Sequence, residues 1–289
     1  MKAFAKILII SACFVLVGAI IAGVGVALGA KGFVFDRGGK LITVKGEGVG
    51  SSVEASEKLE AFSEATIDVK CGKVIVEAGN EYSIEIKYSA EELKPTYAVK
   101  NGKLEVTSPN GGFFLNFGMF DFDKNYVKVI VPSDALKNLS VDSSAGEVDI
   151  SGLTGTSDGK ITVRASAGGI DIENVYGFGE LNVKSSAGGV DLEGVTVGSA
   201  VVKSSAGSIE IKDFEGSLEA DSSAGGVEVS LRDGAYSDAK YSVSLKASAG
   251  SVEVDGRHIK GSEYSFGSGS KYIIHIKSSA GSVKFDTNR

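Results

Sequence analysis

The sequence predicts an all-β protein: a parallel β-solenoid, or single-stranded β-helix, of about seven short coils, with a β-hairpin-rich N-terminal cap and one preceding transmembrane helix. Three observations predict this fold. The tripeptide Ser-Ala-Gly recurs seven times, apolar and polar residues alternate on both sides of the copies, and one long uncharged segment lies near the N-terminus. Glycine contributes 39 of the 289 residues and proline only 3, which favours tight corners between strands over collagen or proline-rich linkers.

Composition also excludes several classes of function. The formal net charge is −7, which argues against a non-specific nucleic-acid surface. The chain has 2 cysteines, 2 histidines and no tryptophan, so a disulfide scaffold is excluded and a Cys/His zinc site is disfavoured. We therefore expect no nucleic-acid partner and no cofactor.

The uncharged segment Ile7–Ala30 is 24 residues long and lies between Lys6 and Lys31. A membrane-spanning helix needs about 20 such residues, whereas a secretory signal has an apolar region of about 7–15. This length favours an uncleaved anchor over cleavage near Ala27-Leu28-Gly29. The flanking positive charges do not decide the orientation. We place residues 1–6 in the cytoplasm and expect a single-pass protein of the cell membrane with an extracellular C-terminal domain.

Residues 31–60 are rich in glycine, serine and charge and predict a linker, with one short helical turn near Ser56–Ala61. Alternation then begins, and residues 61–135 are expected to form the N-terminal cap. Within the cap, Asn101-Gly102 lies between two short alternating segments, which is a strong hairpin signal.

An aromatic segment, Gly111–Phe122, interrupts the predicted cap. It either covers the open end of the β structure or forms an exposed patch that contacts lipid or a partner. Burial of each large side chain contributes about 1.5–3 kcal/mol, which favours the cover. The candidate residues are Phe113, Phe114, Phe117, Met119, Phe120 and Phe122.

The Ser-Ala-Gly copies lie in residues 136–289, and their successive spacings are 22, 20, 19, 18, 25 and 31 residues. In the first unit Leu139, Val141, Ser143 and Ala145 share the inward face, which shifts by one residue after Gly146. Such a shift indicates a corner where the chain bends and restarts its alternation. The predicted corner residues are Ala145, Gly146, Ala167, Gly168, Ala187, Gly188, Ala206, Gly207, Ala224, Gly225, Ala249, Gly250, Ala280 and Gly281.

About twenty residues hold two strands and two turns, and such a unit cannot bury both of its faces alone. Copies stacked one after another, about 4.8 Å apart, can do so. The repeat therefore predicts a parallel solenoid, with an antiparallel sandwich as the alternative. The two longer spacings indicate loops around Asp233–Lys240 and Arg257–Ser270.

Stacking would align the outward residue of the strand that follows each corner. The last of these residues is Lys284. The other six are acidic: Asp149, Asp171, Asp191, Glu210, Glu228 and Glu253. Stacked like charges repel each other by roughly 1 kcal/mol per pair in water at ~4 Å. A solvated face is the favoured interpretation, and weak binding of Ca²⁺ or of a wall polymer is the alternative. The nine-residue motif of calcium-binding β-rolls is absent from the sequence, so we predict no dedicated metal site.

Together these features resemble a bacterial family known as "putative adhesins", whose domain has no established function. The resemblance lies in the basic N-terminus with Lys2 and Lys6, the apolar segment ending at Ala27-Leu28-Gly29, the hairpin Lys100–Leu104 and the seven Ser-Ala-Gly copies. It covers nearly the whole chain. The resemblance implies a single-pass bacterial envelope protein with a β-solenoid, and it implies no activity.

The sequence contains no G-x-S-x-G, H-E-x-x-H or P-loop pattern. Cys71 replaces a small corner residue, His258 lies in a predicted loop, and His275 lies at an outward strand position. We therefore expect no catalytic residues and no enzyme.

Three functions are compatible with the sequence. The favoured one is an adhesin-like scaffold or binding module with a protein or cell-wall glycan partner. The second is an envelope-stress sensor or regulatory subunit that acts through a membrane partner. The third is a polysaccharide-cleaving enzyme of the pectin-lyase type, which the short coils and the lack of a basic residue among the stacked acids disfavour.

Overall fold

The computed structural model describes residues 30–35, 41–45, 53–88, 93–109, 113–116 and 124–288. Every regular element of these residues except short 3₁₀ turns is a β-strand. No helix within the described ranges is long and apolar enough to cross a membrane. The predicted anchor Ile7–Ala30 lies outside them except for its last residue.

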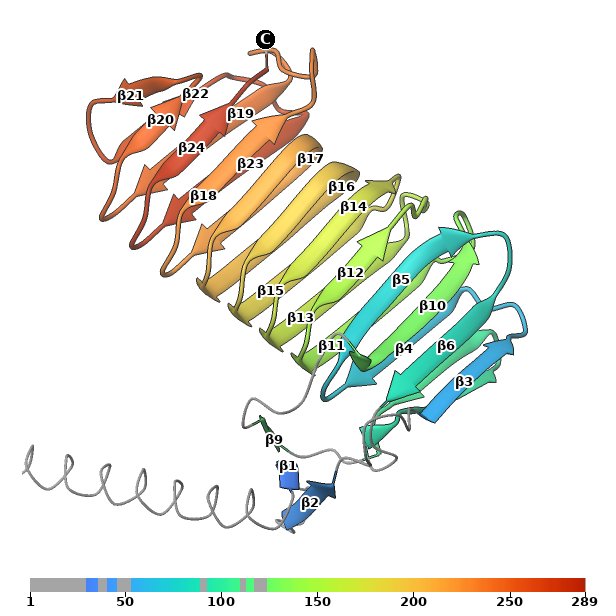
Figure 1. Cartoon of the computed structure of the whole chain (residues 1–289). Coiled ribbons are helices and arrows are strands. Elements are labelled where there is room, and N and C mark those ends of the chain that lie inside the picture. Colours follow the sequence, from blue (N-terminus) through green and yellow to red (C-terminus); the bar gives the residue numbers. More distant parts are fainter. Residues whose placement is uncertain are drawn as a thin grey trace, which may run out of the picture.

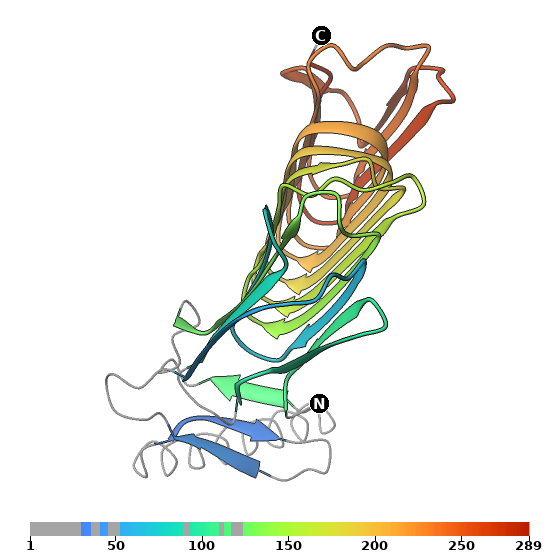
Figure 2. The same cartoon turned by 90° about the vertical axis from the view of Figure 1, so that its right-hand side faces the viewer.

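The predicted parallel solenoid is confirmed. Each coil supplies one strand before and one strand after its Ser-Ala-Gly corner, and the two sets form two faces of a rod (Figures 1 and 2). All these strands belong to one continuous sheet of 21 strands, whose two faces we call the pre-corner and post-corner sheets. The pre-corner sheet contains β4 (Glu64–Val69), β11 (Asn138–Ala145), β13 (Lys160–Ala167), β15 (Glu180–Ala187), β19 (Tyr241–Ala247), β23 (Tyr272–Ser278) and the C-terminal parts of β16 (Val190–Ala206) and β17 (Ile209–Ser222). The post-corner sheet contains β5 (Lys73–Gly79), β12 (Val148–Ser151), β14 (Ile170–Tyr176), the N-terminal parts of β16 and β17, β18 (Val227–Leu231), β20 (Val252–Val254) and β24 (Val283–Asp286).

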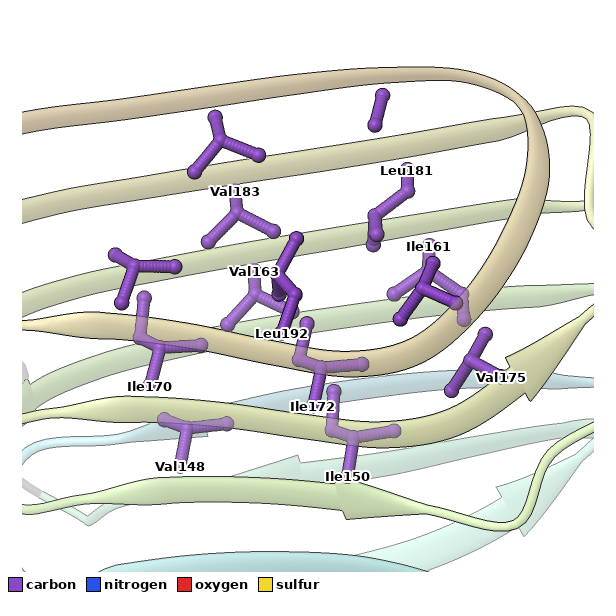
Figure 3. Close-up of a cluster of buried hydrophobic side chains, with 14 of the residues drawn as sticks. Val148, Ile150, Ile161, Val163, Ile170, Ile172, Val175, Leu181, Val183 and Leu192 are labelled. Carbon is purple, nitrogen blue, oxygen red and sulfur yellow. The ribbon is translucent and has the colours of Figure 1, made fainter. Parts of the chain in front are cut away.

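The core lies between these two sheets. Apolar side chains of successive coils form columns, such as Val148, Ile170 and Val190, in which each residue pairs in parallel with the next. Ile161 and Val163 of the pre-corner sheet lie in the same buried cluster as Val148 and Ile170 of the post-corner sheet (Figure 3). A single coil could not shield these side chains from water, so burial of apolar area depends on stacking.

At each corner the backbone turns without losing its bonds to the neighbouring coil. Gly188 donates its N–H to the carbonyl of Ala206 at 3.0 Å, and Gly168 donates to Ala187 at the same distance. Gly188 has a φ of 146°, which L side chains rarely adopt. A Cβ atom on Gly188 would lie 2.1 Å from the carbonyl oxygen of Gly168. Glycine is therefore required here both for its backbone conformation and for the close approach of the next coil.

The side chains at the corner differ from the sequence prediction. Ser185, two residues before Ala187, is buried, and its hydroxyl donates to the carbonyl of Gly188 at 3.1 Å. The alanines stack in register, since Ala167 pairs with Ala145 and Ala187 pairs with Ala167. Ala167 and Ala187 are nevertheless exposed and Ala145 only half-buried, so the prediction that Ala145 shares the inward face was wrong. The alternation already breaks after Ser185, and it breaks equally after Ala165, which has no hydroxyl, so the turn of the backbone into the glycine ends it early.

The last two coils are exchanged relative to the sequence. Strand β23 of the seventh Ser-Ala-Gly copy pairs with β17 on one side and with β19, of the sixth copy, on the other. Strand β24 likewise lies between β18 and β20, where its red arrow is visible in Figure 1. The expectation that copies stack strictly in chain order was therefore wrong for this pair. The longer spacings of 25 and 31 residues give the chain the length to pass over one coil and return.

Antiparallel strands close both ends of the rod. At the N-terminal end, β3 (Val53–Lys58), β6 (Ser83–Tyr88) and β10 (Tyr126–Pro132) extend the post-corner sheet, and the hairpin β7 (Thr96–Lys100) and β8 (Lys103–Thr107) extends the pre-corner sheet. The predicted hairpin at Asn101-Gly102 is confirmed, with φ values of 53° and 72°. At the other end β21 (Arg257–Ile259) pairs with β20, and β22 (Glu263–Phe266) pairs with β19.

Several segments predicted as irregular form strands. The helical turn predicted near Ser56–Ala61 is absent, because Ser56 lies in β3, whose partner is β6. The predicted linker also contains most of β1 (Ala30–Phe35) and all of β2 (Leu41–Lys45). The predicted loop Arg257–Ser270 contains β21 and β22, whereas Asp233–Lys240 contains no strand. Among these strands β3, β21 and β22 pair on one side only, and edge strands can be short and polar, so their sequences resemble loops. Strand β1 is instead the central strand of a separate three-stranded sheet.

The aromatic segment is described only in part. Phe113 and Phe114 lie in β9 (Phe113–Asn116), which pairs antiparallel with β1 in a separate sheet of three strands. Phe117, Met119, Phe120 and Phe122 lie outside the described residues. Whether the segment covers the end of the solenoid stays a prediction.

Replacing Gly188 with alanine tests the corner. We expect Gly188→Ala to lower the free energy of unfolding by about 2–4 kcal/mol, because a positive φ and a displaced carbonyl both add strain. Urea unfolding followed by circular dichroism measures the change. Gly189→Ala is the matched control, since its Cβ would meet nothing closer than 3.8 Å. Equal stability of the two variants would contradict the close-packed corner.

Candidate functional site

The parallel register aligns acidic side chains on the outside of the post-corner sheet. Asp149 pairs with Asp171, Asp171 with Asp191, and Asp191 with Glu210, one residue per coil. Glu228 follows Glu210. We call these five residues the acidic ladder. A second, outer column places Glu173 beside Glu193. The separation between hydrogen-bonded strands, about 4.8 Å, sets the spacing of the carboxylates.

The middle of the acidic ladder is electrostatically strained. Burial and the nearby charges of Asp191 and Asp149 raise the pKa of Asp171 above its usual value. Burial and the charge of Glu210 raise the pKa of Asp191. Among the described residues neither carboxylate has a lysine or arginine within ion-pair distance. Folding therefore brings these charges together at a cost in free energy.

Basic residues compensate the ends of the acidic ladder. Lys73 lies 2.6 Å from Asp149, and Lys212 forms an ion pair with Glu210. Lys284 lies between Glu228 and Glu253, 3.6 Å from the former, because the last two coils are exchanged. Glu253 is therefore separated from the other predicted acids. The prediction that no basic residue sits among the stacked acids was wrong, since chain order does not reveal the exchange.

The pre-corner sheet carries the opposite charge over the same coils. Arg164 pairs with Lys184, and Lys184 pairs with Lys203, in a column that we call the basic ladder. An open groove of about 300 Å³ lies over it. A groove of about 260 Å³ lies over the acidic residues of the post-corner sheet, beside Asp171 and Asp191. The outer faces of the rod are thus two charged, regularly spaced surfaces.

Among the residues that the structure describes, those capable of covalent or acid–base chemistry are not assembled into a site. Cys71 is buried at a corner, and burial raises the pKa of its thiol to about 12, so the reactive thiolate does not form near neutral pH. The carbonyl of Cys71 accepts a hydrogen bond from the Tyr88 hydroxyl at 2.6 Å. His275 is exposed at its predicted outward position, and His258 lies in β21 rather than in a loop. Nδ1 of His258 is 3.7 Å from Glu253.

Metal ligands are not gathered either. Within the part of the chain that the structure describes, no three His, Cys, Asp or Glu side chains are arranged to hold a metal ion. The acidic ladder spaces its carboxylates one per coil instead of converging them on one point. Divalent coordination needs several oxygen ligands around one centre.

Sequence analysis missed a second column of special backbone positions. Gly152, Asn174, Gly194 and Asp213 have φ values of 74°, 55°, 66° and 52°. Each lies two residues after the last inward residue of a post-corner strand. Glycine, asparagine and aspartate tolerate this left-handed conformation best. Their recurrence at a fixed distance from the strand was the available signal for the second corner.

A half-buried ion cluster at the second corner fixes the loop before β19. The Nζ atom of Lys240 lies 3.0 Å from Glu215, and the guanidinium of Arg232 lies 4.0 Å from the same carboxylate. The hydrogen bond and charge of Lys240 hold the pKa of Glu215 below its usual value. Arg232 also pairs with Asp213 at 3.1 Å. These contacts attach residues 232–240 to the preceding coil and so help to position the exchanged coils.

Comparison with known proteins gives a family. The model of the Toastrack DUF4097 family matches residues 62–287, which include nearly all of the cap and the solenoid. No curated protein matches the chain. The match confirms the family resemblance that the Ser-Ala-Gly repeat predicts.

Solved structures also match the chain. A "putative cell adhesion protein" from Clostridium sporogenes is 16% identical over 82% of this chain and 99% of its own, with a TM-score of 0.43. A "putative adhesin" from Bacteroides fragilis is 17% identical over 82% of this chain and 97% of its own, with a TM-score of 0.47. Another from Parabacteroides distasonis is 11% identical over 82% and 98%, with a TM-score of 0.42.

Removing one charge from the acidic ladder tests its electrostatic strain. We expect Asp171→Asn to raise the free energy of unfolding at pH 7 by about 0.5 kcal/mol, because two like-charge contacts disappear. Since the folded-state pKa of Asp171 is raised, the gain is full above that pKa and vanishes as the pH falls below the ordinary value of 3.8. Urea titrations at pH 7 and pH 3 measure it. Asp142→Asn, which removes an attraction to Arg164 at 3.6 Å, is the control and should not stabilise the protein; a stabilisation of equal size there would contradict the assignment.

The ion cluster predicts the opposite pH dependence. Glu215→Gln should destabilise the protein by roughly 1–2 kcal/mol at neutral pH, because Lys240 and Arg232 lose a half-buried partner. The lowered pKa of Glu215 means that its contribution is present above the ordinary value of 4.5 and is lost as the pH falls through the folded-state pKa. Chemical unfolding at pH 7 and pH 3 compares this variant with Glu219→Gln, whose ion pair with Lys203 is exposed and which should lose much less. No difference at pH 7 would exclude a stabilising role for the cluster.

Proposed function

This chain belongs to the Toastrack DUF4097 family, and we propose that it is a non-enzymatic, membrane-anchored envelope protein. Its β-solenoid acts outside the cell as an adhesin-like scaffold and binding module. The partner is a protein or a glycan of the cell wall. The observation that carries the proposal is the pair of charged ladders, which repeat at constant spacing along two open faces.

Repetition along a rod suits binding to extended partners. Each coil presents the same kind of side chain at the same place, so a polymer or a flat surface meets many weak contacts at once. The grooves over both ladders are shallow features on the outside of the sheets. A small-molecule enzyme usually encloses its substrate in a pocket lined mainly by apolar groups.

The chemistry of the described residues supports a binding role over catalysis. The thiol of Cys71 is buried and its pKa is raised to about 12. His275 is exposed on the pre-corner sheet beside Glu219, and His258 lies on the final edge strand beside Glu253. A nucleophile, a base and an oxyanion donor are therefore not brought together by these residues.

The uncharged segment Ile7–Ala30 supports attachment to a membrane. Its length of 24 residues matches the hydrocarbon core of a bilayer. The remaining chain then lies on one side of the membrane.

Fractionation and wall binding test the proposal together. The full chain should sediment with membranes, require detergent for release, and be digested by protease added to intact spheroplasts. The control Leu16→Arg/Ile20→Arg should leave the membrane fraction, because two charges near the centre of the segment disfavour insertion.

The detergent-solubilised chain should then co-sediment with isolated cell walls without releasing soluble glycan fragments. Release of fragments would show an enzyme. Absence of wall binding, with crosslinks confined to a membrane partner of the segment 7–30, would replace the proposal with a regulatory subunit.

A further inference from the structure

Opposite charges occupy opposite faces of the same three coils. The coil formed by β13 and β14 carries Arg164 and Asp171, and the next carries Lys184 and Asp191. The third, within β16 and β17, carries Lys203 and Glu210. Because both ladders belong to the same coils, they share one spacing and run in the same direction along the rod.

Each ladder keeps unsatisfied charge at its centre. Asp171 and Asp191 have no ion-pair partner among the described residues, and their pKa values are raised. On the other face Arg164 is 3.6 Å from Asp142, and Lys203 pairs with Glu219 at 2.7 Å. Lys184, between them, has no ion-pair partner within the described ranges. The central carboxylates and the central ammonium can therefore form ion pairs with charged groups of another molecule.

We propose that a second copy of this chain docks on the first, with the acidic ladder of one copy against the basic ladder of the other. A sideways shift of one copy, without rotation, places post-corner sheet against pre-corner sheet with all coils in register. The contact uses a different face of each copy, so each copy of a pair keeps one charged face unused. Further copies can add to these faces and extend the pair into a row of rods. This inference goes beyond the proposed function, because it concerns contacts between copies and not the envelope partner.

Steric and electrostatic features favour a second copy of the chain as the docking partner. Gly169 and Gly189 lie outward beside Asp171 and Asp191 on the post-corner face, where small residues leave room for long basic side chains to approach. A linear polyanion would complement only the basic ladder and would leave the acidic ladder uncompensated. A second copy supplies both signs of charge at the matching spacing. Exposed ion pairs are weak and screened by salt, so the contact must depend on ionic strength.

Charge reversal on each face provides the test. The full chain in detergent is studied by sedimentation velocity at 50 and 500 mM NaCl, as the native protein, as Lys184→Glu/Lys203→Glu, and as Asp191→Lys/Glu210→Lys. We expect the native protein to associate at low salt and to dissociate at high salt. Each variant alone should associate at least tenfold more weakly, and an equimolar mixture of the two should associate again. Circular dichroism verifies that the variants are folded; Lys184→Gln and Asp191→Asn replace any variant that is not.

Three outcomes would overturn the proposal. One is equal association of all samples, which would place the contact elsewhere, for example in the segment 7–30. Another is loss of association in both variants without recovery in the mixture. The third is association that requires Ca²⁺ and survives Lys184→Glu/Lys203→Glu, which would mean that two acidic faces meet through cations. None of these three outcomes measures membrane sedimentation or co-sedimentation with cell walls, so failure here is distinguishable from failure of the proposed function.

Discussion

The structure depends on how one coil passes over the next at the Ser-Ala-Gly corner. The glycine there donates its N–H to the alanine carbonyl of one neighbouring coil, and its Cα faces the glycine carbonyl of the other at a distance that leaves no room for a Cβ. This contact holds adjacent coils at strand separation through the bend. The apolar columns between the sheets can therefore stay in contact along the whole rod, and their burial supplies most of the stabilisation.

The strict register at the corner also determines which outward side chains lie next to each other on the surface. Once Ala167 lies beside Ala187, the outward residues on both sides are aligned as well, whether or not their charges are compatible. The acidic ladder is the result, and its central members carry raised pKa values. The basic ladder lies on the opposite face of the same coils, so the register sets one column of each sign on the rod. The exchange of the last coils relieves one end by placing Lys284 between Glu228 and Glu253.

The repeat made much of the fold predictable. Seven copies of one tripeptide with alternating flanks specify parallel coils, and Asn101-Gly102 specifies a hairpin. The exposed corner alanines were not predictable from parity alone, because the backbone turns toward the glycine early and ends the alternation after Ser185 and equally after Ala165. The coil exchange could not be predicted from the sequence either. The long spacings show that the chain has extra residues there, but they do not show which route those residues take. The alignment of acids followed directly from the repeat, whereas their compensation by Lys73 and Lys284 depends on tertiary order.

Cysteine pairing at the corner tests the stacking most directly. Exposed alanines in adjacent coils should lie about 4.8 Å apart, so cysteines in their place can form a disulfide. Alanines in coils two steps apart should be too distant for a disulfide. We predict that Ala224→Cys/Ala280→Cys crosslinks under mild oxidation and that Ala224→Cys/Ala249→Cys does not, because Gly225 donates its N–H to the carbonyl of Ala280. Crosslinking of the second pair instead of the first would mean that the copies stack in chain order, and it would contradict both the coil exchange and the interrupted acidic column.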